Sequence, residues 1–272
     1  EVVRDTLAKR VPLERDDETR RLAQVQNDLW IATLAGDLDA AEKAAVAWDR
    51  VHAASLVAED HMAPYFHRLE ILAERGDVRG ALEVADEAER RAAGWTGGGS
   101  GALMVAMAAA RERAGRIDEP AFARILQQAL RDDPRTFAYG FNLERLATRE
   151  QAIDALALAP DASVSDPLAP IEQAAFLGHA YFEAGRVQEA LPHLRQITNT
   201  CSILPTADTI RAYTVLWMRA HVELGQALEQ TGDAAGACDA YAPVLDRWKN
   251  AKPRSVSLEK AKERSKALGC SK

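Results

Sequence analysis

The sequence has little of what usually marks a catalytic, metal-binding or disulfide-rich protein. Its 272 residues include three cysteines, which are too few for a disulfide scaffold and too scattered for a metal site. Aromatic residues make up 6% of the chain, and no apolar run approaches the roughly 18 residues of a membrane-spanning helix. Gly-x-Ser-x-Gly, His-Glu-x-x-His and protein-kinase motifs are all missing. We therefore expect neither enzyme activity nor a metal, a cofactor or a transmembrane span in this chain.

Helix-forming residues are abundant instead. Alanine, leucine, glutamate and arginine dominate, and the hydrophobic content of 47% is ample for a packed core. The net charge of −7 does not fit a nucleic-acid-binding chain. Residues 249–272 nevertheless carry a net charge of +6 and residues 1–248 one of −13. This basic tail indicates either the solvated face of a terminal helix or a contact for phosphates or an anionic membrane surface.

Glycines at a nearly constant spacing divide the first half of the chain into helical hairpins. Gly36, Gly76 and Gly115 each follow a segment with helical periodicity, at steps of 40 and 39 residues. A glycine in such a place ends one helix, and the aspartate that follows Gly36 and Gly76 begins the next. We expect Pro64 in the first turn of its helix, where proline is best tolerated.

Two repeats between residues 171 and 248 are the clearest. The segments AAFLGHAYFEAGRVQEALPHL and AHVELGQALEQTGDAAGACDAY align with Gly185 over Gly232. In this register a Leu-Gly pair recurs, with glycine at Gly178 and Gly225. Small residues at fixed offsets are needed where the two helices of a hairpin cross closely.

These two segments resemble the tetratricopeptide repeat. The family pattern continues with an aromatic residue such as Tyr181, a glycine, an alanine such as Ala190 or Ala237, and an aromatic residue such as Tyr241. The resemblance implies an all-α fold, a right-handed solenoid of about five helical hairpins. The amphipathic segment Ser257–Leu268 fits the polar C-terminal cap helix that a solenoid needs.

The chain is accordingly divided into four parts. Residues 1–16 are a lead-in helix or linker, residues 17–134 N-terminal degenerate hairpins, residues 135–170 an irregular helical seam, and residues 171–272 two repeats with the cap helix. The glycine-rich residues 94–101 lack the lysine of a phosphate-binding loop and are interpreted as an inter-repeat loop.

The resemblance also implies a function and a set of contact residues. Tetratricopeptide arrays bind extended peptides on their concave face, which suggests a non-catalytic module that binds a protein or peptide. Carried onto this sequence, the concave positions are Glu172, Ala175, His179, Phe182, Glu183, Arg219, Val222, Gln226, Glu229 and Gln230. This mixture suits a polar or basic ligand better than an acidic one. In the alternative interpretation, this face is solvated or covered by the chain's own segments.

The wider context rests on a narrower resemblance. Residues from Gly232 onward are similar to the C-terminal repeat region of multidomain serine/threonine kinases of the myxobacterial type. That similarity implies a sensory or scaffolding region of a larger bacterial signalling protein. One alternative is a structural module that packs on its parent protein or forms a homodimer. Another is a small-molecule site in the seam.

The cysteines permit a geometric prediction. Cys238 lies near the start of the last repeat's second helix, and the chain turns near Pro253 before it returns along the final helix. If these helices are antiparallel neighbours, Cys270 returns to the level of Cys238 and a disulfide forms. Cys201, about 30 Å away along the preceding helix, stays free. The alternative is three reduced, buried thiols. A disulfide would point to an extracytoplasmic rather than a cytoplasmic location.

Overall fold

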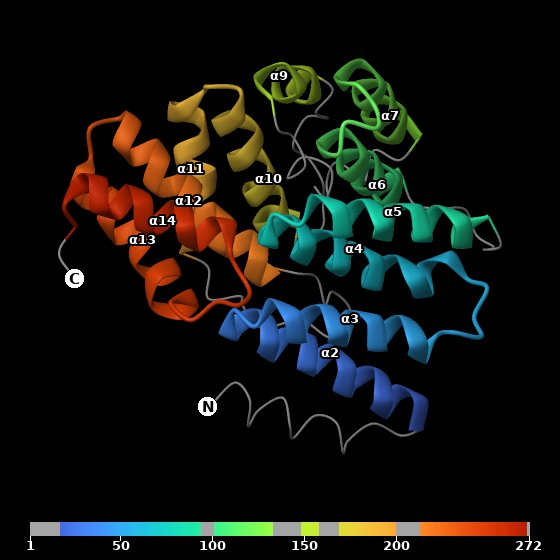
Figure 1. The fold of residues 1–272 in the computed structure, drawn as a ribbon. Helices are drawn as coiled ribbons and strands as arrows, with labels where there is room; N and C mark the ends of the chain where they lie inside the picture. The colour runs from blue at the N-terminus through green and yellow to red at the C-terminus, as the bar shows by residue number, and fades with distance from the viewer. Residues whose placement is uncertain (1–16, 94–100, 133–147, 158–168, 200–212, 271–272) are drawn as a thin grey trace.

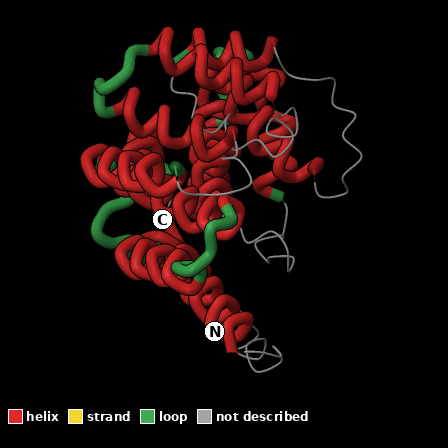
Figure 2. Tube along the Cα trace, turned by 90° about the vertical axis from the view of Figure 1, so that its right-hand side faces the viewer, coloured by secondary structure: helices red, strands yellow, loops and turns green. Residues whose placement is uncertain are grey.

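The computed structural model describes residues 17–93, 101–132, 148–157, 169–199 and 213–270. Within these ranges the chain consists of helices and short connections, without a strand (Figures 1 and 2). The predicted all-α class is therefore confirmed. None of the helices in the described ranges is both long enough and apolar enough to cross a membrane.

Twelve helices follow one another in these ranges. They are α2 (Asp17–Ala35), α3 (Leu38–Val51), α4 (Ala58–Arg75), α5 (Val78–Ala92), α6 (Gly101–Arg113), α7 (Glu119–Asp132), α9 (Arg149–Ala157), α10 (Ala169–Glu183), α11 (Val187–Thr198), α12 (Tyr213–Gln230), α13 (Ala234–Trp248) and α14 (Val256–Leu268). Consecutive helices pack against each other from α2 to α14. The lead-in segment 1–16, most of the seam 135–170 and Cys201 lie outside the described residues.

The predicted glycine stops are confirmed. Gly36 and Gly76 have φ values of 73° and 69°, a left-handed conformation that glycine adopts without strain. Positive φ also occurs at Gly115, Gly185, Gly232 and Gly269. After the first two turns, the carboxylates of Asp37 and Asp77 accept hydrogen bonds from backbone N–H groups of the next helix. The Gly-Asp pair thus ends one helix and caps the next.

Pro64 lies elsewhere than predicted. Helix α4 begins at Ala58, so Pro64 is in its interior rather than in its first turn. An interior proline weakens a helix because it donates no backbone hydrogen bond. The preceding turn is held by a tertiary contact instead. His61 is fully buried, its Nδ1 lies 2.7 Å from a carboxylate oxygen of Asp49, and its Nε2 lies 3.1 Å from the carbonyl oxygen of Ser55.

The Leu-Gly pairs mark close helix crossings. A Cβ atom on Gly178 in α10 would lie 2.9 Å from Cδ2 of Leu194 in α11. A Cβ atom on Gly225 in α12 would overlap the ring of Tyr241 in α13. Both glycines therefore let the two helices of a hairpin approach closely, as the repeat pattern predicts.

The array closes on itself. Helix α2 of the first hairpin packs against both α12 and α13 of the last repeat. The fully buried Trp248 donates a hydrogen bond from Nε1 to the carbonyl oxygen of Thr33 at 2.9 Å. Next to it, Leu38 N donates to Lys252 O at 2.9 Å, and Lys252 N donates to Gly36 O at 3.0 Å. Residues 215 positions apart in the chain thus become packing neighbours.

The final helix is present where it was expected. Helix α14 packs on α12 and α13 and also reaches α4 in the N-terminal part. Its buried residues are Ser257, Leu258, Ala261 and Ser265. Helix α14 therefore bridges the last hairpin and α4.

Candidate functional site

A cavity of about 370 Å³ lies where the N-terminal hairpins face the C-terminal repeats. Its walls come from α4, α5, α6, α10, α12 and α14. The apolar lining is formed by Ala73, Val78, Ala81, Ala110 and Val256, and the charged or polar lining by Glu74, Asp77, Arg113, His179, Arg219 and Ser257. We call this space the central cavity.

Two residues of the predicted concave face line this cavity. His179 of α10 places Nδ1 at 2.7 Å from a carboxylate oxygen of Glu223 in α12. Arg219, one helical turn before Glu223, donates from Nε to Glu74 at 3.2 Å. The structure thus brings His179 and Arg219 to one space, and it gives each of them an acidic partner.

Glu74 connects three helices beside the cavity. Its side chain is fully buried, and its carboxylate accepts hydrogen bonds from Oγ of Ser255 at 2.8 Å and from N and Oγ of Ser257, each at 2.9 Å. Arg219 supplies the opposite charge. A buried carboxylate is costly unless donors surround it, and these groups from α12 and α14 provide them. Arg219 therefore holds the closed array together as well as lining the cavity.

Glu183 lies one turn beyond His179 on α10. Its side chain is half-buried, and burial raises the pKa of its carboxyl group; nearby Glu223 adds to this shift and His179 opposes it. No hydrogen bond to the Glu183 carboxylate is found among the described residues. Among the described carboxylates of the predicted face, Glu183 is consequently the one best placed to accept a donor from outside.

The remaining predicted positions differ in their surroundings. Ala175 and Val222 are buried in the core, and Phe182 packs partly against it. Gln226 is half-buried and Gln230 is exposed. The side chain of Glu172 lies outside the described residues.

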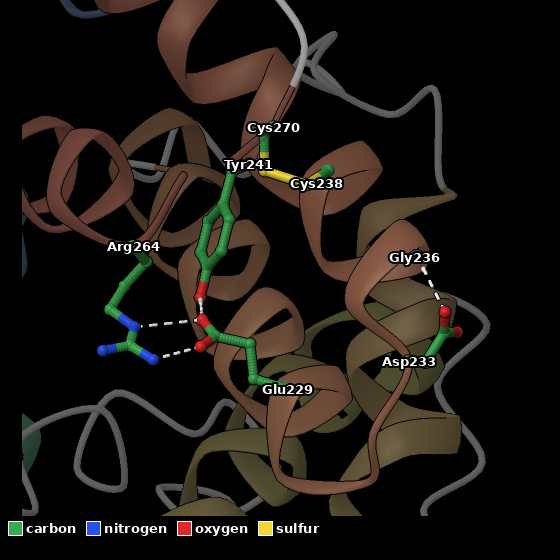
Figure 3. The surroundings of a disulfide bond; sticks show 7 residues. All are labelled: Glu229, Asp233, Gly236, Cys238, Tyr241, Arg264 and Cys270. Atoms are coloured by element: carbon green, nitrogen blue, oxygen red, sulfur yellow. Dashed lines mark hydrogen bonds and ion pairs between the residues drawn. A yellow bond between two sulfur atoms is a disulfide. The ribbon is translucent and has the colours of Figure 1, made fainter. Parts of the chain in front are cut away.

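Glu229 faces helices α13 and α14. Its carboxylate accepts a hydrogen bond from Tyr241 at 2.5 Å and pairs with the guanidinium of Arg264 (Figure 3). The hydrogen bond from Arg264 lowers the pKa of Glu229. Burial raises the pKa of Tyr241, and the hydrogen bond to Glu229 raises it further. Glu229 thus fastens α14 to the last hairpin.

Cys238 and Cys270 form a disulfide, as the antiparallel return of α14 predicts (Figure 3). Their Cα atoms are 5.6 Å apart, and 32 residues separate them in the chain. The bond attaches the C-terminal end of α14 to α13. It lies beside the contact of Glu229 with Arg264, so two different interactions hold the same helix (Figure 3).

Reduction of this disulfide is expected to lower the free energy of unfolding by about 3–4 kcal/mol. A cross-link that closes a loop of this length restricts the unfolded chain by roughly that amount. Urea unfolding with and without a reducing agent measures the effect. A chain with both Cys238→Ser and Cys270→Ser serves as the control, because its stability should not respond to the reductant. Equal stability of the oxidised and reduced wild type would contradict the prediction.

His221 is buried without a partner for one nitrogen. Its Nδ1 lies 3.0 Å from the carbonyl oxygen of Ala240, which makes Nδ1 the donor, while its buried Nε2 has no hydrogen-bond partner in the described structure. Burial lowers the pKa of His221 to about 4, and the positive charge of Arg247 adds to this shift. The imidazole is therefore neutral near neutral pH.

Acidification is expected to destabilise the fold through His221. The unfolded state binds a proton near pH 6.5 and the folded state only near pH 4, so stability is lost as the pH falls through this window. The loss amounts to about 3 kcal/mol. His221→Gln removes this titration while keeping a side-chain donor. We expect urea midpoints measured across the window to fall more steeply for the wild type than for His221→Gln, and parallel curves would argue against this assignment.

The sequence pointed to His179 and Arg219 but gave no signal for the opposite wall. Glu74, Val78 and Arg113 belong to the degenerate hairpins, where no family position marks a ligand contact. Val256 lies just before the predicted cap helix Ser257–Leu268. These residues join the cavity only because the array closes.

Comparison with known proteins adds no family assignment. The chain matches no family model, and no curated protein shows significant sequence similarity to it.

In the described part of the chain, no three His, Cys, Asp or Glu side chains gather as metal ligands would.

Proposed function

We propose that the chain is a non-catalytic module that binds a protein or peptide segment in the central cavity. The supporting observation is the cavity itself, because it lies between the hairpins and contains His179 and Arg219 of the predicted concave face. Its volume of about 370 Å³ falls within the size range typical of ligand pockets. Its mostly small apolar walls with a few charged groups are also typical of such pockets.

The finer architecture and context belong to the same proposal. The hairpins follow a tetratricopeptide-like, right-handed solenoid in which α14 acts as the C-terminal cap. The module is the sensory or scaffolding region of a larger bacterial signalling protein. Its Cys238–Cys270 disulfide favours an oxidising compartment.

Binding to the cavity can be tested without knowing the natural partner. Peptides selected from a random display library on the wild-type chain are measured against Val78→Asp, which places a charge at the cavity. We expect at least a tenfold loss of affinity, because an apolar contact is replaced by a desolvated carboxylate. Ile153→Asp is the matched control, since Ile153 is a similarly exposed apolar residue on α9. Selected peptides that bind both variants like the wild type would reject the cavity as the binding site.

A structural role is the second candidate. It is favoured by the contacts that Arg219 and Glu229 make within the chain, which are those of structural residues. In that case the module packs on its parent protein or forms a homodimer. Light scattering over a range of concentrations separates the homodimer from a monomer, because only self-association makes the mass depend on concentration.

A further inference from the structure

The central cavity has unpartnered apolar side chains. Val78 and Val256, the first residues of α5 and α14, both line it and are 43% and 42% exposed. Isolated exposed valines are ordinary, but these two line one cavity together with Ala73, Ala81 and Ala110. A large apolar side chain from a bound segment would remove this surface from water.

Two acidic residues, Glu183 and Glu223, lie close to His179 of the cavity wall. His179 lines the wall and contacts Glu223, and Glu183 follows His179 by one helical turn. The Glu183 carboxylate is half-buried and accepts no hydrogen bond from the described residues. Partial desolvation without a donor is unfavourable for a carboxylate, so a donor brought by a ligand would relieve it.

The charged side chains that line the cavity are two carboxylates and two guanidinium groups. Arg219 is compensated by the buried carboxylate of Glu74, and Arg113 of α6 lies with Asp77 of α5 among the residues that line the cavity. His179 has a carboxylate partner in Glu223. On the α10 side, the Glu183 carboxylate accepts no hydrogen bond from the described residues.

From these observations we propose that the cavity recognises an extended peptide segment that carries a large apolar side chain beside a lysine or arginine. The apolar side chain fills the space between Val78 and Val256, and the basic group pairs with Glu183. This inference rests on the proposed peptide-binding function and specifies its ligand. Complementarity of charge then selects basic segments against acidic ones.

The test uses short, capped Gly-Ser peptides with one central phenylalanine. On each side of the phenylalanine, one position is changed to lysine, glutamine or glutamate in separate peptides. The affinity of each peptide is measured by fluorescence polarisation. We expect the best lysine peptide to bind about tenfold more tightly than its glutamate counterpart. Glu183→Gln should reduce this preference to near equality, and Val78→Asp should abolish the binding of all three peptides. Glu189→Gln, on the exposed side of α11, is the control and should bind like the wild type.

The outcomes distinguish this inference from the proposed function. Tighter binding of the glutamate peptides, or a lysine preference that survives Glu183→Gln, overturns the inference, and the peptide-binding function stands if Val78→Asp still abolishes binding. Failure of every phenylalanine peptide, while selected peptides bind at the cavity, also overturns the inference alone. Failure of both peptide sets overturns the inference and the function together.

Discussion

Replacing Trp248 by alanine is expected to lower the free energy of unfolding by about 3–5 kcal/mol. The indole is fully buried between the last hairpin and the first, and its Nε1 donates to Thr33 O. The substitution would leave a large cavity and remove one of the two hydrogen bonds that Thr33 O accepts, since Gly36 N also donates to it at 3.1 Å. Equilibrium urea unfolding measures the loss.

Trp248→Phe separates the two contributions. The phenyl ring keeps part of the packing but cannot donate the hydrogen bond, so we expect a smaller loss than for alanine. Hydrogen exchange at the backbone N–H groups of Leu38 and Lys252, which bond across the same contact, gives a local readout. If Trp248→Ala left the exchange of both groups unchanged, the closing contact would not depend on this residue.

Replacing Glu74 by alanine is expected to cost about 3–5 kcal/mol, as does the removal of one partner from a buried ion pair. The change leaves the guanidinium of Arg219 without its carboxylate, and the hydroxyl groups of Ser255 and Ser257 without an acceptor. Chemical unfolding monitored by circular dichroism gives the value.

Two further variants serve as references for Glu74. Glu74→Gln keeps an acceptor oxygen but removes the charge, so we expect an intermediate loss. Glu83→Ala removes an exposed carboxylate that pairs with Arg79 within α5, and such a pair contributes at most about 1 kcal/mol. A loss at Glu74 no larger than that at Glu83 would show that Glu74 does not hold α4, α12 and α14 together.

Local features of the fold were predictable from the sequence. A helix stop at Gly36 or Gly76 depends on the conformation of one residue and on the aspartate next to it, and both are visible in a short window. The disulfide was also predictable, because an antiparallel return over a short loop fixes where Cys270 lies relative to Cys238.

Long-range features were not predictable in this way. Helix α4 begins before Pro64, in a turn where His61 contacts Asp49 of α3, so Pro64 alone misplaced its start. The buried carboxylate of Glu74 has its donors in α12 and α14, more than a hundred residues along the chain. Nothing in the periodicity of α4 indicates them. The same limit applies to the site: the repeat pattern indicated His179, whereas Val78 reaches the cavity only through tertiary packing.

The hydrogen bond from Trp248 to Thr33 has a consequence for how the protein unfolds. In an open solenoid, an end repeat has a single neighbour, so the chain can fray from its termini. Here the first hairpin is bounded by α4 on one side and by α12 and α13 on the other, so its loss breaks two interfaces at once. Cooperativity should therefore be high for a repeat protein. Breaking the contact between Trp248 and Thr33 should convert one sharp unfolding transition into a gradual one that starts at the first hairpin.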